Sequence, residues 1–309
     1  MNNHLRLILM FCLCYIIQAY AYALAKRDSI LTSKNGSYTI ISGNKNMSID
    51  PNAGGRITSF KLGNYEFLTG KDIHPDNYGS TFWPSPQTIW NWPPPSVLDN
   101  EPYQSVNNGK SIILTSGKDP VTGLQFIKEF STGKNDWLEI TYSMINISQD
   151  VKKAAPWEVT RAHKGGLLFF PAGETPLGKK SFDKAPAETI NGIVWYKDEK
   201  TRPEKDLLTI DDGSEGWIAY AIDGRVFIKK FDDIKPAQFA PGEAEISFYI
   251  SSAADYIEIE IQGEYKPIDP GKRSVWKVKW TAANVPSDIK IEKGNEQLVE
   301  LVRGLIKKS

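Results

Sequence analysis

The sequence predicts an all-β protein built from large antiparallel sheets, with one short helix at the C-terminus. Three observations support this fold class. Apolar and polar residues alternate with a period of two in several segments, turn-forming residues separate these segments roughly every ten positions, and a helical apolar pattern occurs only near the end of the chain. Short, evenly spaced strands of this kind are typical of β-sandwiches and barrels.

The first 25 residues have the pattern of a secretory signal peptide. Arg6 precedes an apolar run over 7–17, and alanine then recurs at every second position over 19–25. The run is too short for a comfortable membrane span. We therefore expect residues 1–25 to be removed and residues 26–309 to fold as a single β-sandwich domain, located in the periplasm or secreted. Cys12 and Cys14 lie in the removed part, so we expect no disulfide in the mature chain.

Strands follow along the mature chain wherever apolar residues occupy alternate positions. The clearest alternation lies in 138–144, 246–250, 257–261 and 276–280, and further strands are predicted at 38–42, 56–62, 112–116, 124–130, 192–196, 217–222 and 226–231. Turns rich in Gly, Pro, Asn and Asp separate them, for example at 50–55, 211–213, 223–224 and 241–242. This arrangement indicates antiparallel pairing.

Two regions depart from the alternation. The segment 72–103 is rich in tryptophan and proline, and we predict a long ordered loop there. Near the end of the chain, five apolar residues fall on one face of a helix, which we expect to pack on the outside of a sheet. These residues are Leu298, Leu301, Val302, Leu305 and Ile306.

Composition excludes several function classes. Lys plus Arg and Asp plus Glu both number 37, which gives no electrostatic argument for a nucleic-acid partner. The chain has no G-x-S-x-G elbow and no glycine-rich phosphate loop. With His74 and His163 the only histidines of the mature chain, we expect no metal and no cofactor, although calcium on acidic turns such as 211–212 stays open. We expect a soluble monomer.

The aromatic segment offers the first candidate binding residues. Trp83, Trp90 and Trp92 lie close together among prolines. Flat indole rings suit the C–H face of a pyranose, and such sites need a few polar groups beside them. The alternative is that these rings only close an open end of the sandwich.

A second candidate lies in 156–163, directly after a predicted strand. Trp157, Glu158, Arg161 and His163 occur within seven positions. In an extended strand Glu158 points to one face, whereas Trp157 and Arg161 point to the other. Arg161 offers a planar fork to hydroxyls or a carboxylate, and His163 is suited to proton transfer near neutral pH. A surface ion pair beside an exposed histidine is the structural alternative.

Two further candidates come from a strand and a turn. Glu258, Glu260, Gln262 and Glu264 share one face of their strand, because isoleucines occupy the other face. We favour a merely solvated position for Glu258, whereas Glu260 is a candidate site residue if that face lines a concavity. Arg56 begins a strand after a tight Gly-Gly turn, from which it can project into a pocket.

These segments together resemble the galactose-mutarotase-like superfamily. Residues 52–57 resemble its N-terminal Gly-Gly-Arg-Ile turn, and 260–263, 270–271 and 276–280 resemble its C-terminal sequence. With the Trp-Glu-Val-Thr-Arg segment at 157–161, the chain most resembles an uncharacterised, domain-of-unknown-function branch found in exported bacterial proteins. The resemblance implies a large antiparallel β-supersandwich that handles sugars on its concave side.

The resemblance also implies roles for two residues. Mutarotases and related epimerases use a glutamate that takes the anomeric hydroxyl proton and a histidine that assists ring opening, and Glu260 and His163 are the nearest equivalents by order along the chain. The usual histidine motif of these enzymes is replaced here by 157–161. We therefore expect an exported carbohydrate-binding or carbohydrate-active protein that acts on a mono- or oligosaccharide. If it is an enzyme, we expect a cofactor-independent mutarotase-like or epimerase-like isomerase.

Two other functions stay open at this point. One is a non-catalytic glycan-binding or structural envelope protein, in which the aromatic segment contacts sugar or protein without turnover. The other is a polysaccharide lyase or hydrolase, which needs paired acids or a Tyr-His pair within reach of one another.

Overall fold

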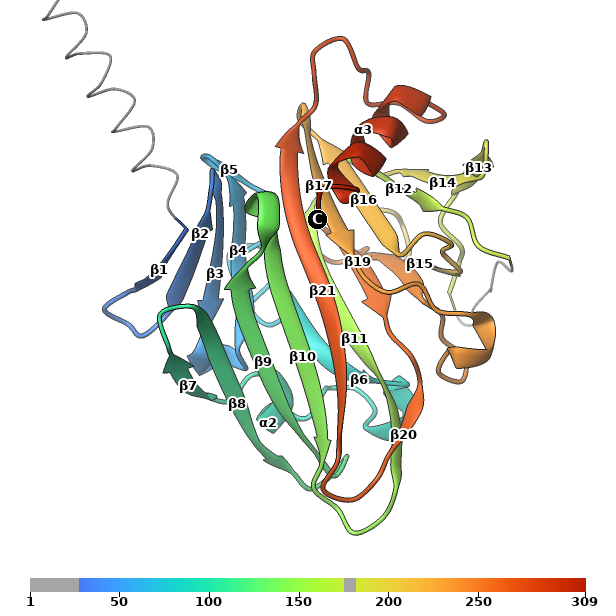
Figure 1. Cartoon of the computed structure of the whole chain (residues 1–309). Helices are drawn as coiled ribbons and strands as arrows, with labels where there is room; N and C mark the ends of the chain where they lie inside the picture. The colour runs from blue at the N-terminus through green and yellow to red at the C-terminus, as the bar shows by residue number, and fades with distance from the viewer. Residues whose placement is uncertain (1–27, 175–181) are drawn as a thin grey trace, which may run out of the picture.

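The computed structural model describes residues 28–174 and 182–309, and two large antiparallel sheets dominate it (Figure 1). The expected signal peptide at 1–25 lies outside the described residues, so its removal and the exported location stay predictions. The all-β fold class with a short C-terminal helix is confirmed. In the described ranges, no helix has the length and apolar character needed to cross a membrane.

The first sheet has eleven strands, which include the first six strands of the described residues. Its strands, in spatial order, are β1 (Ser29–Thr32), β2 (Tyr38–Ser42), β3 (Lys45–Asp50), β4 (Arg56–Leu62), β6 (Ser80–Ser85), β11 (Lys152–His163), β19 (Tyr256–Gln262), β18 (Ile246–Ile250) and β15 (Leu207–Asp211). Two short strands lie off this path: β5 (Tyr65–Glu66) pairs with β4, and β20 (Lys266–Ile268) pairs with β11.

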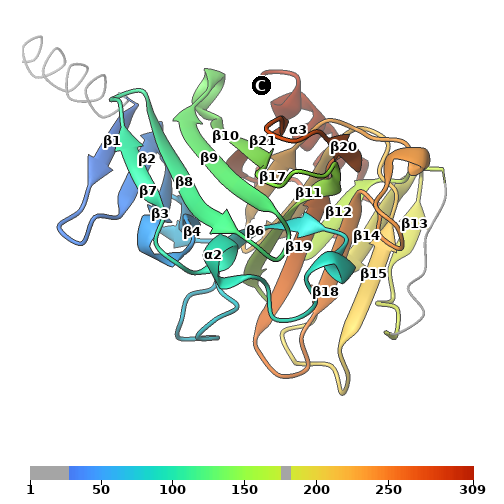
Figure 2. The same cartoon turned by 90° about the horizontal axis from the view of Figure 1, so that it is seen from below.

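The second sheet has ten strands and packs against the first, as the view from below shows (Figure 2). In spatial order they are β13 (Glu188–Ile190), β14 (Ile193–Lys197), β12 (Leu167–Pro171), β16 (Trp217–Ile222), β17 (Arg225–Lys230), β21 (Arg273–Asn284), β10 (Leu138–Asn146), β9 (Leu124–Thr132), β8 (Ser111–Asp119) and β7 (Gln104–Asn107).

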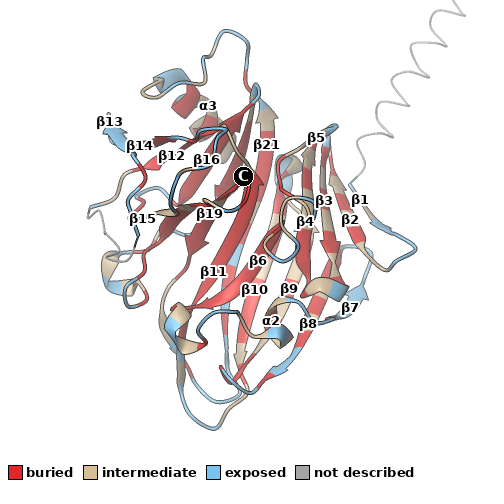
Figure 3. Cartoon of the chain, turned by 180° about the vertical axis from the view of Figure 1, so that it is seen from behind, coloured by how far each residue is buried: buried red, intermediate tan, exposed pale blue. Residues whose placement is uncertain are grey.

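The main core fills the space between the two sheets. Inward-facing residues of the first sheet, such as Ile257 and Ile259, join residues of the second sheet, such as Ile140 and Val278, in one buried cluster. Buried residues therefore dominate the middle strands of both sheets, while edge strands such as β7 and β13 stay exposed (Figure 3). Apolar burial of this extent stabilises a chain that has no disulfide among its described residues.

The helix α3 (Glu296–Ile306) covers the outer face of the second sheet. The Asn295 side chain caps it by accepting a hydrogen bond from the backbone N–H of Gln297 at 3.0 Å. Leu298, Val299 and Val302 pack on a second cluster that includes tryptophans of β14 and β16. The apolar face predicted from the sequence is thus the face that meets the sheet.

The prediction of a loop over 72–103 was wrong in part. The segment contains a central strand, β6, and a short helix, α2 (Ser96–Asp99). All six residues of β6 are buried, so the strand shows no alternation of apolar and polar residues. Pro84 of β6 faces Pro156 of β11, a position where neither residue needs an N–H to donate across the ladder.

Candidate functional site

One pocket lies on the face of the first sheet that points away from the second sheet. Five neighbouring strands, β6, β11, β19, β18 and β15, contribute its lining, and its volume is about 410 Å³. Alternation selects these side chains, because the residues between them on β18 and β19 belong to the core between the sheets. The antiparallel register then places Glu258 opposite Tyr249 and Glu260 opposite Ser247.

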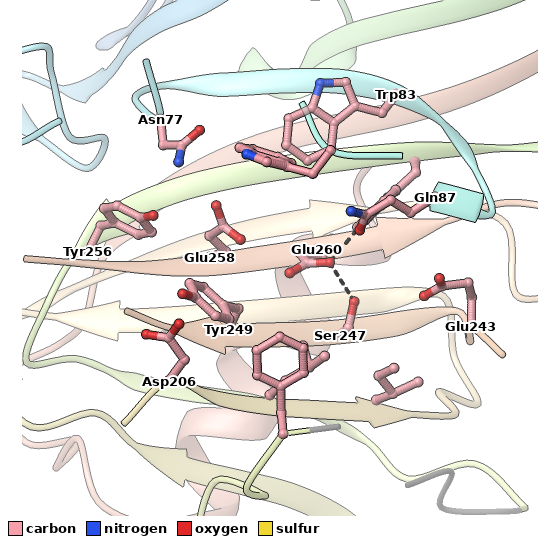
Figure 4. Close-up of a pocket in the computed structure, with 15 residues that line it drawn as sticks. Asn77, Trp83, Gln87, Asp206, Glu243, Ser247, Tyr249, Tyr256, Glu258 and Glu260 are labelled. Carbon is pink, nitrogen blue, oxygen red and sulfur yellow. Dashed lines mark hydrogen bonds between the residues drawn. The ribbon is translucent and has the colours of Figure 1, made fainter. Parts of the chain in front are cut away.

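Glu260 forms the floor of this pocket (Figure 4). It is only 3 % exposed, and its Oε2 accepts hydrogen bonds from the Trp157 indole N–H at 3.0 Å and from the Ser247 hydroxyl at 2.7 Å. Burial, helped by the nearby carboxylates of Glu258 and Glu243, raises the pKa of Glu260 to about 7 despite the lowering effect of the two hydrogen bonds. A carboxyl group in this range accepts or donates a proton readily at neutral pH.

Glu258 lies two residues earlier on the same face of β19 and also lines the pocket. Its Oε1 accepts a hydrogen bond from Nε of Arg161 at 2.8 Å, and the two residues face each other across the ladder. Arg161 is fully buried, donates a second hydrogen bond to the Thr81 hydroxyl at 2.8 Å, and lies 5.0 Å from the Trp83 ring. Arg161 therefore holds Glu258 and supports the neighbouring aromatic wall.

Tryptophan rings form that wall. Trp83 and Trp157 face each other across β6 and β11, with ring centres 5.4 Å apart and planes at 80°. Trp92 meets Trp83 at 5.9 Å and 81°, and all three line the pocket. The Trp83 indole N–H donates to Asp99 at 2.7 Å, which fixes the ring.

The remaining lining combines polar and apolar side chains. Asn77, Gln87 and Tyr256 supply polar groups, and Figure 4 shows Glu258, Glu260 and Ser247 among them. Other lining residues are Phe182, Asp206, Leu208, Ile210, Glu243 and Tyr249. Ser247 and Tyr249 were not predicted from the sequence as site residues, although they alternate with the inward-facing residues of β18.

Six of the candidate residues named from the sequence come together around this pocket: Trp83, Trp92, Trp157, Arg161, Glu258 and Glu260. Arg161 is buried against the wall, and the other five line the pocket. Because they come from three strands and one loop, only the folded register brings them within reach of one ligand.

Glu158 does not line the pocket, because its side chain points into the core between the sheets. It is fully buried, accepts hydrogen bonds from the Tyr142 hydroxyl at 2.6 Å and the Trp280 indole at 3.1 Å, and pairs with Lys229 at 3.0 Å. Trp157 and Arg161 of the same strand point to the opposite face of the sheet. The contacts of Glu158 are those of a structural ion pair.

His163 and Trp90 also lie outside the pocket lining. His163 ends β11, and its backbone carbonyl accepts a hydrogen bond from Tyr220 at 2.7 Å. Trp90 is 7 % exposed and donates its indole N–H to the Pro84 carbonyl at 2.7 Å, behind Trp83.

Arg56 contributes to the pocket only through another residue. It is 3 % exposed, and its guanidinium pairs with Asp99 at 3.1 Å, the same carboxylate that accepts the Trp83 indole N–H. It also lies 4.3 Å from the centre of the Tyr78 ring. Arg56 therefore helps to hold the wall without lining the cavity.

Within the two described ranges, no group of three or more His, Cys, Asp or Glu side chains is arranged to hold a metal ion. The acidic turn at 211–212, considered above for calcium, therefore belongs to no such group among the described residues. Asp211 and Asp212 are buried at the end of β15, and burial raises the pKa of each carboxyl.

Comparison with known proteins gives a family and a fold. The family described as "Domain of unknown function (DUF4380)" matches residues 85–283, which include most of the pocket lining. No functionally curated sequence matches the chain.

Solved structures match over most of the chain at low identity. A galactose mutarotase related enzyme from Lactobacillus acidophilus has a TM-score of 0.58 and 13 % identity, covering 82 % of this chain and 99 % of its own. A candidate aldose 1-epimerase from Escherichia coli K12 has a TM-score of 0.55 and 12 % identity, covering 81 % and 99 %. A galactose mutarotase-like protein from Lactobacillus casei has a TM-score of 0.53 and 14 % identity, covering 80 % and 100 %. The chain therefore has a galactose-mutarotase-like fold.

Proposed function

The chain belongs to the DUF4380 family, and we propose that it binds a carbohydrate in the pocket over Glu260 and transfers protons at the anomeric carbon of that sugar. One observation carries the proposal. A buried carboxyl group with a pKa of about 7 lies at the floor of a cavity that has tryptophan on one side and hydrogen-bonding side chains around it. Apolar walls with a few placed polar groups are the usual composition of a small-molecule site.

The proposed reaction needs no redox or group-transfer step. The Glu260 carboxylate accepts the proton of the anomeric hydroxyl, a carbonyl forms at C1, and the bond from C1 to the ring oxygen breaks while that oxygen takes up a proton from solvent. Reclosure on the other face of the carbonyl gives the other anomer and returns both protons. General acid–base catalysis of this kind contributes roughly 10²–10⁴-fold in rate.

The experiment compares wild-type protein with Glu260→Gln on freshly dissolved α-D-glucose and α-D-galactose. The anomeric ratio is followed by ¹H NMR, and binding is measured separately by calorimetry. We expect the wild type to accelerate mutarotation and Glu260→Gln to lose at least about a hundredfold of that acceleration while it keeps most of its affinity. Glu264→Gln is the matched control, because Glu264 follows the same strand and lies outside the pocket lining.

An unchanged rate in Glu260→Gln would remove Glu260 from the catalytic role.

One observation favours a second candidate function, binding without turnover: neither His74 nor His163, the histidines of the described ranges, lines the pocket. Wild-type protein that binds these sugars without accelerating mutarotation would establish this second function. Absence of both binding and turnover across a broad sugar panel would reject the carbohydrate site altogether.

A further inference from the structure

Trp92 is unlike every other tryptophan of the chain. All nine tryptophans lie in the described ranges, and eight of them are no more than 7 % exposed, whereas Trp92 is 56 % exposed. It lines the pocket from the segment between β6 and α2. An indole that stays in water keeps a large apolar area available, which a ligand can remove from solvent.

The Trp92 ring also has unused hydrogen-bonding capacity. Trp83, Trp90 and Trp157 each donate the indole N–H, to Asp99, to the Pro84 carbonyl and to Glu260. Trp92 donates to none of the residues that the structure describes. It meets Trp83 almost perpendicularly, and more than half of its surface stays open to solvent.

Exposed aromatic surface is concentrated at this pocket. Among the exposed large hydrophobic side chains of the described residues, the aromatic ones are Trp92 and Phe182, and both line the cavity. The other exposed residues of this class are aliphatic and lie outside the lining. A patch of this kind at the rim of a cavity marks a surface that contacts a ligand or partner.

The cavity is large enough to contain an inner part over Glu260 and an outer part beside Trp92. The volume of about 410 Å³ exceeds what one hexose ring occupies. Glu260 and Ser247 form a hydrogen-bonded polar pair at the floor, whereas Trp92 is the solvent-exposed part of the wall. A single ring bound over Glu260 therefore leaves the Trp92 face for something attached to that ring.

We infer that the pocket takes the reducing end of an oligosaccharide, with the terminal ring over Glu260 and the second pyranose ring stacked on Trp92. The occupant of the outer part is a sugar ring because a pyranose combines an apolar C–H face for the indole with a hydroxyl that accepts from its N–H. This inference rests on the proposed function, because it takes the reacting ring to be the one over Glu260.

The test measures the affinity for monosaccharides and their reducing disaccharides side by side. D-glucose is compared with cellobiose and maltose, D-galactose with galactobiose, and D-mannose with mannobiose, by calorimetry on wild type, Trp92→Ala and Trp92→Phe. We expect at least one disaccharide to bind about tenfold more tightly than its monosaccharide. Trp92→Ala should weaken disaccharide binding about tenfold more than monosaccharide binding and so remove this difference, whereas Trp92→Phe should keep most of it.

The outcomes separate the inference from the proposed function. If monosaccharides bind and Trp92→Ala changes the affinity for both sugar sizes equally, or changes neither, the outer subsite is rejected and the site over Glu260 stands. A wild type that binds both sizes equally also rejects the subsite. If no sugar of either size binds, the proposed function fails and the inference fails with it. Circular dichroism of Trp92→Ala checks folding, which an exposed side chain should not disturb.

Discussion

Glu260 connects the stability of the chain with its proposed chemistry. The same burial that suits its carboxyl group for proton transfer makes ionisation unfavourable in the folded state, so its pKa is about 7 rather than near 4.5. The folded state then binds more protons at Glu260 than the unfolded state between these two values. Stability from this group is therefore full below pH 4.5 and is lost as the pH rises through about 7.

Glu260→Gln should remove this loss. We expect the variant to gain on the order of 2 kcal/mol in free energy of unfolding relative to wild type at pH 8, and little at pH 4.5. Urea unfolding at both pH values measures the difference. Glu264→Gln serves as control, because hydrogen bonds to Gln238 and Lys266 lower the pKa of Glu264 and give no gain at high pH. An equal gain for Glu260→Gln at both pH values would mean that this carboxyl titrates in its ordinary range.

At the residue scale, alternation predicted which side chains lie on the same face of a strand. It did not predict which of the two faces lines the pocket. Alternation correctly separated Glu158 from Trp157 and Arg161 on β11, and it put Glu258 and Glu260 together on β19. It could not tell that the face with Glu158 is the one buried between the sheets. That assignment depends on which strands lie on either side of β11, which is a property of the whole sheet.

At the scale of elements, β11 carries a different kind of charge on each face. The outer face holds Arg161 with Glu258, and the inner face holds Glu158 with Lys229 of β17, which joins the two sheets. Lys229 is 1 % exposed and also donates to the Thr160 hydroxyl at 2.6 Å and to the Ile259 carbonyl at 3.0 Å. The inner pair thus fixes the sheet under the pocket without lining it.

Lys229→Met should leave the buried carboxylate of Glu158 without its partner. We expect a loss of about 3–5 kcal/mol in free energy of unfolding. The double variant Lys229→Met with Glu158→Gln removes both charges, so it should recover a large part of that loss and keep sugar binding. Chemical denaturation of the single and double variants measures both effects. A loss below about 1 kcal/mol in the single variant would contradict a buried ion pair at this position.

Strand β6, one of several strands that were not predicted from the sequence, shows why alternation alone was insufficient. A strand that is buried on both faces has no polar phase to detect, and Pro84 argued against a central strand. The ladder accommodates it because Pro84 faces Pro156. The tryptophans of the segment are therefore divided between a strand, which holds Trp83, and the connection after it, which holds Trp92.

At the scale of the whole molecule, the pocket depends on strands that are far apart in the sequence. Residues between 77 and 260 line it, and β6, β11, β19, β18 and β15 meet only because the eleven-stranded sheet places them in that order. Period-two alternation predicted large antiparallel sheets, and the helical apolar pattern near the C-terminus predicted the external helix. Alternation carries no information on strand order, which is why Ser247 beside Glu260 became visible only in the folded register.

The most direct test of the account is a crystal structure of the protein soaked with a reducing sugar that binds in solution. We predict one pyranose ring against the wall of Trp83 and Trp157, with its anomeric hydroxyl within hydrogen-bond distance of the Glu260 carboxylate. Sugar bound on another surface, with the space over Glu260 holding only solvent, would contradict it.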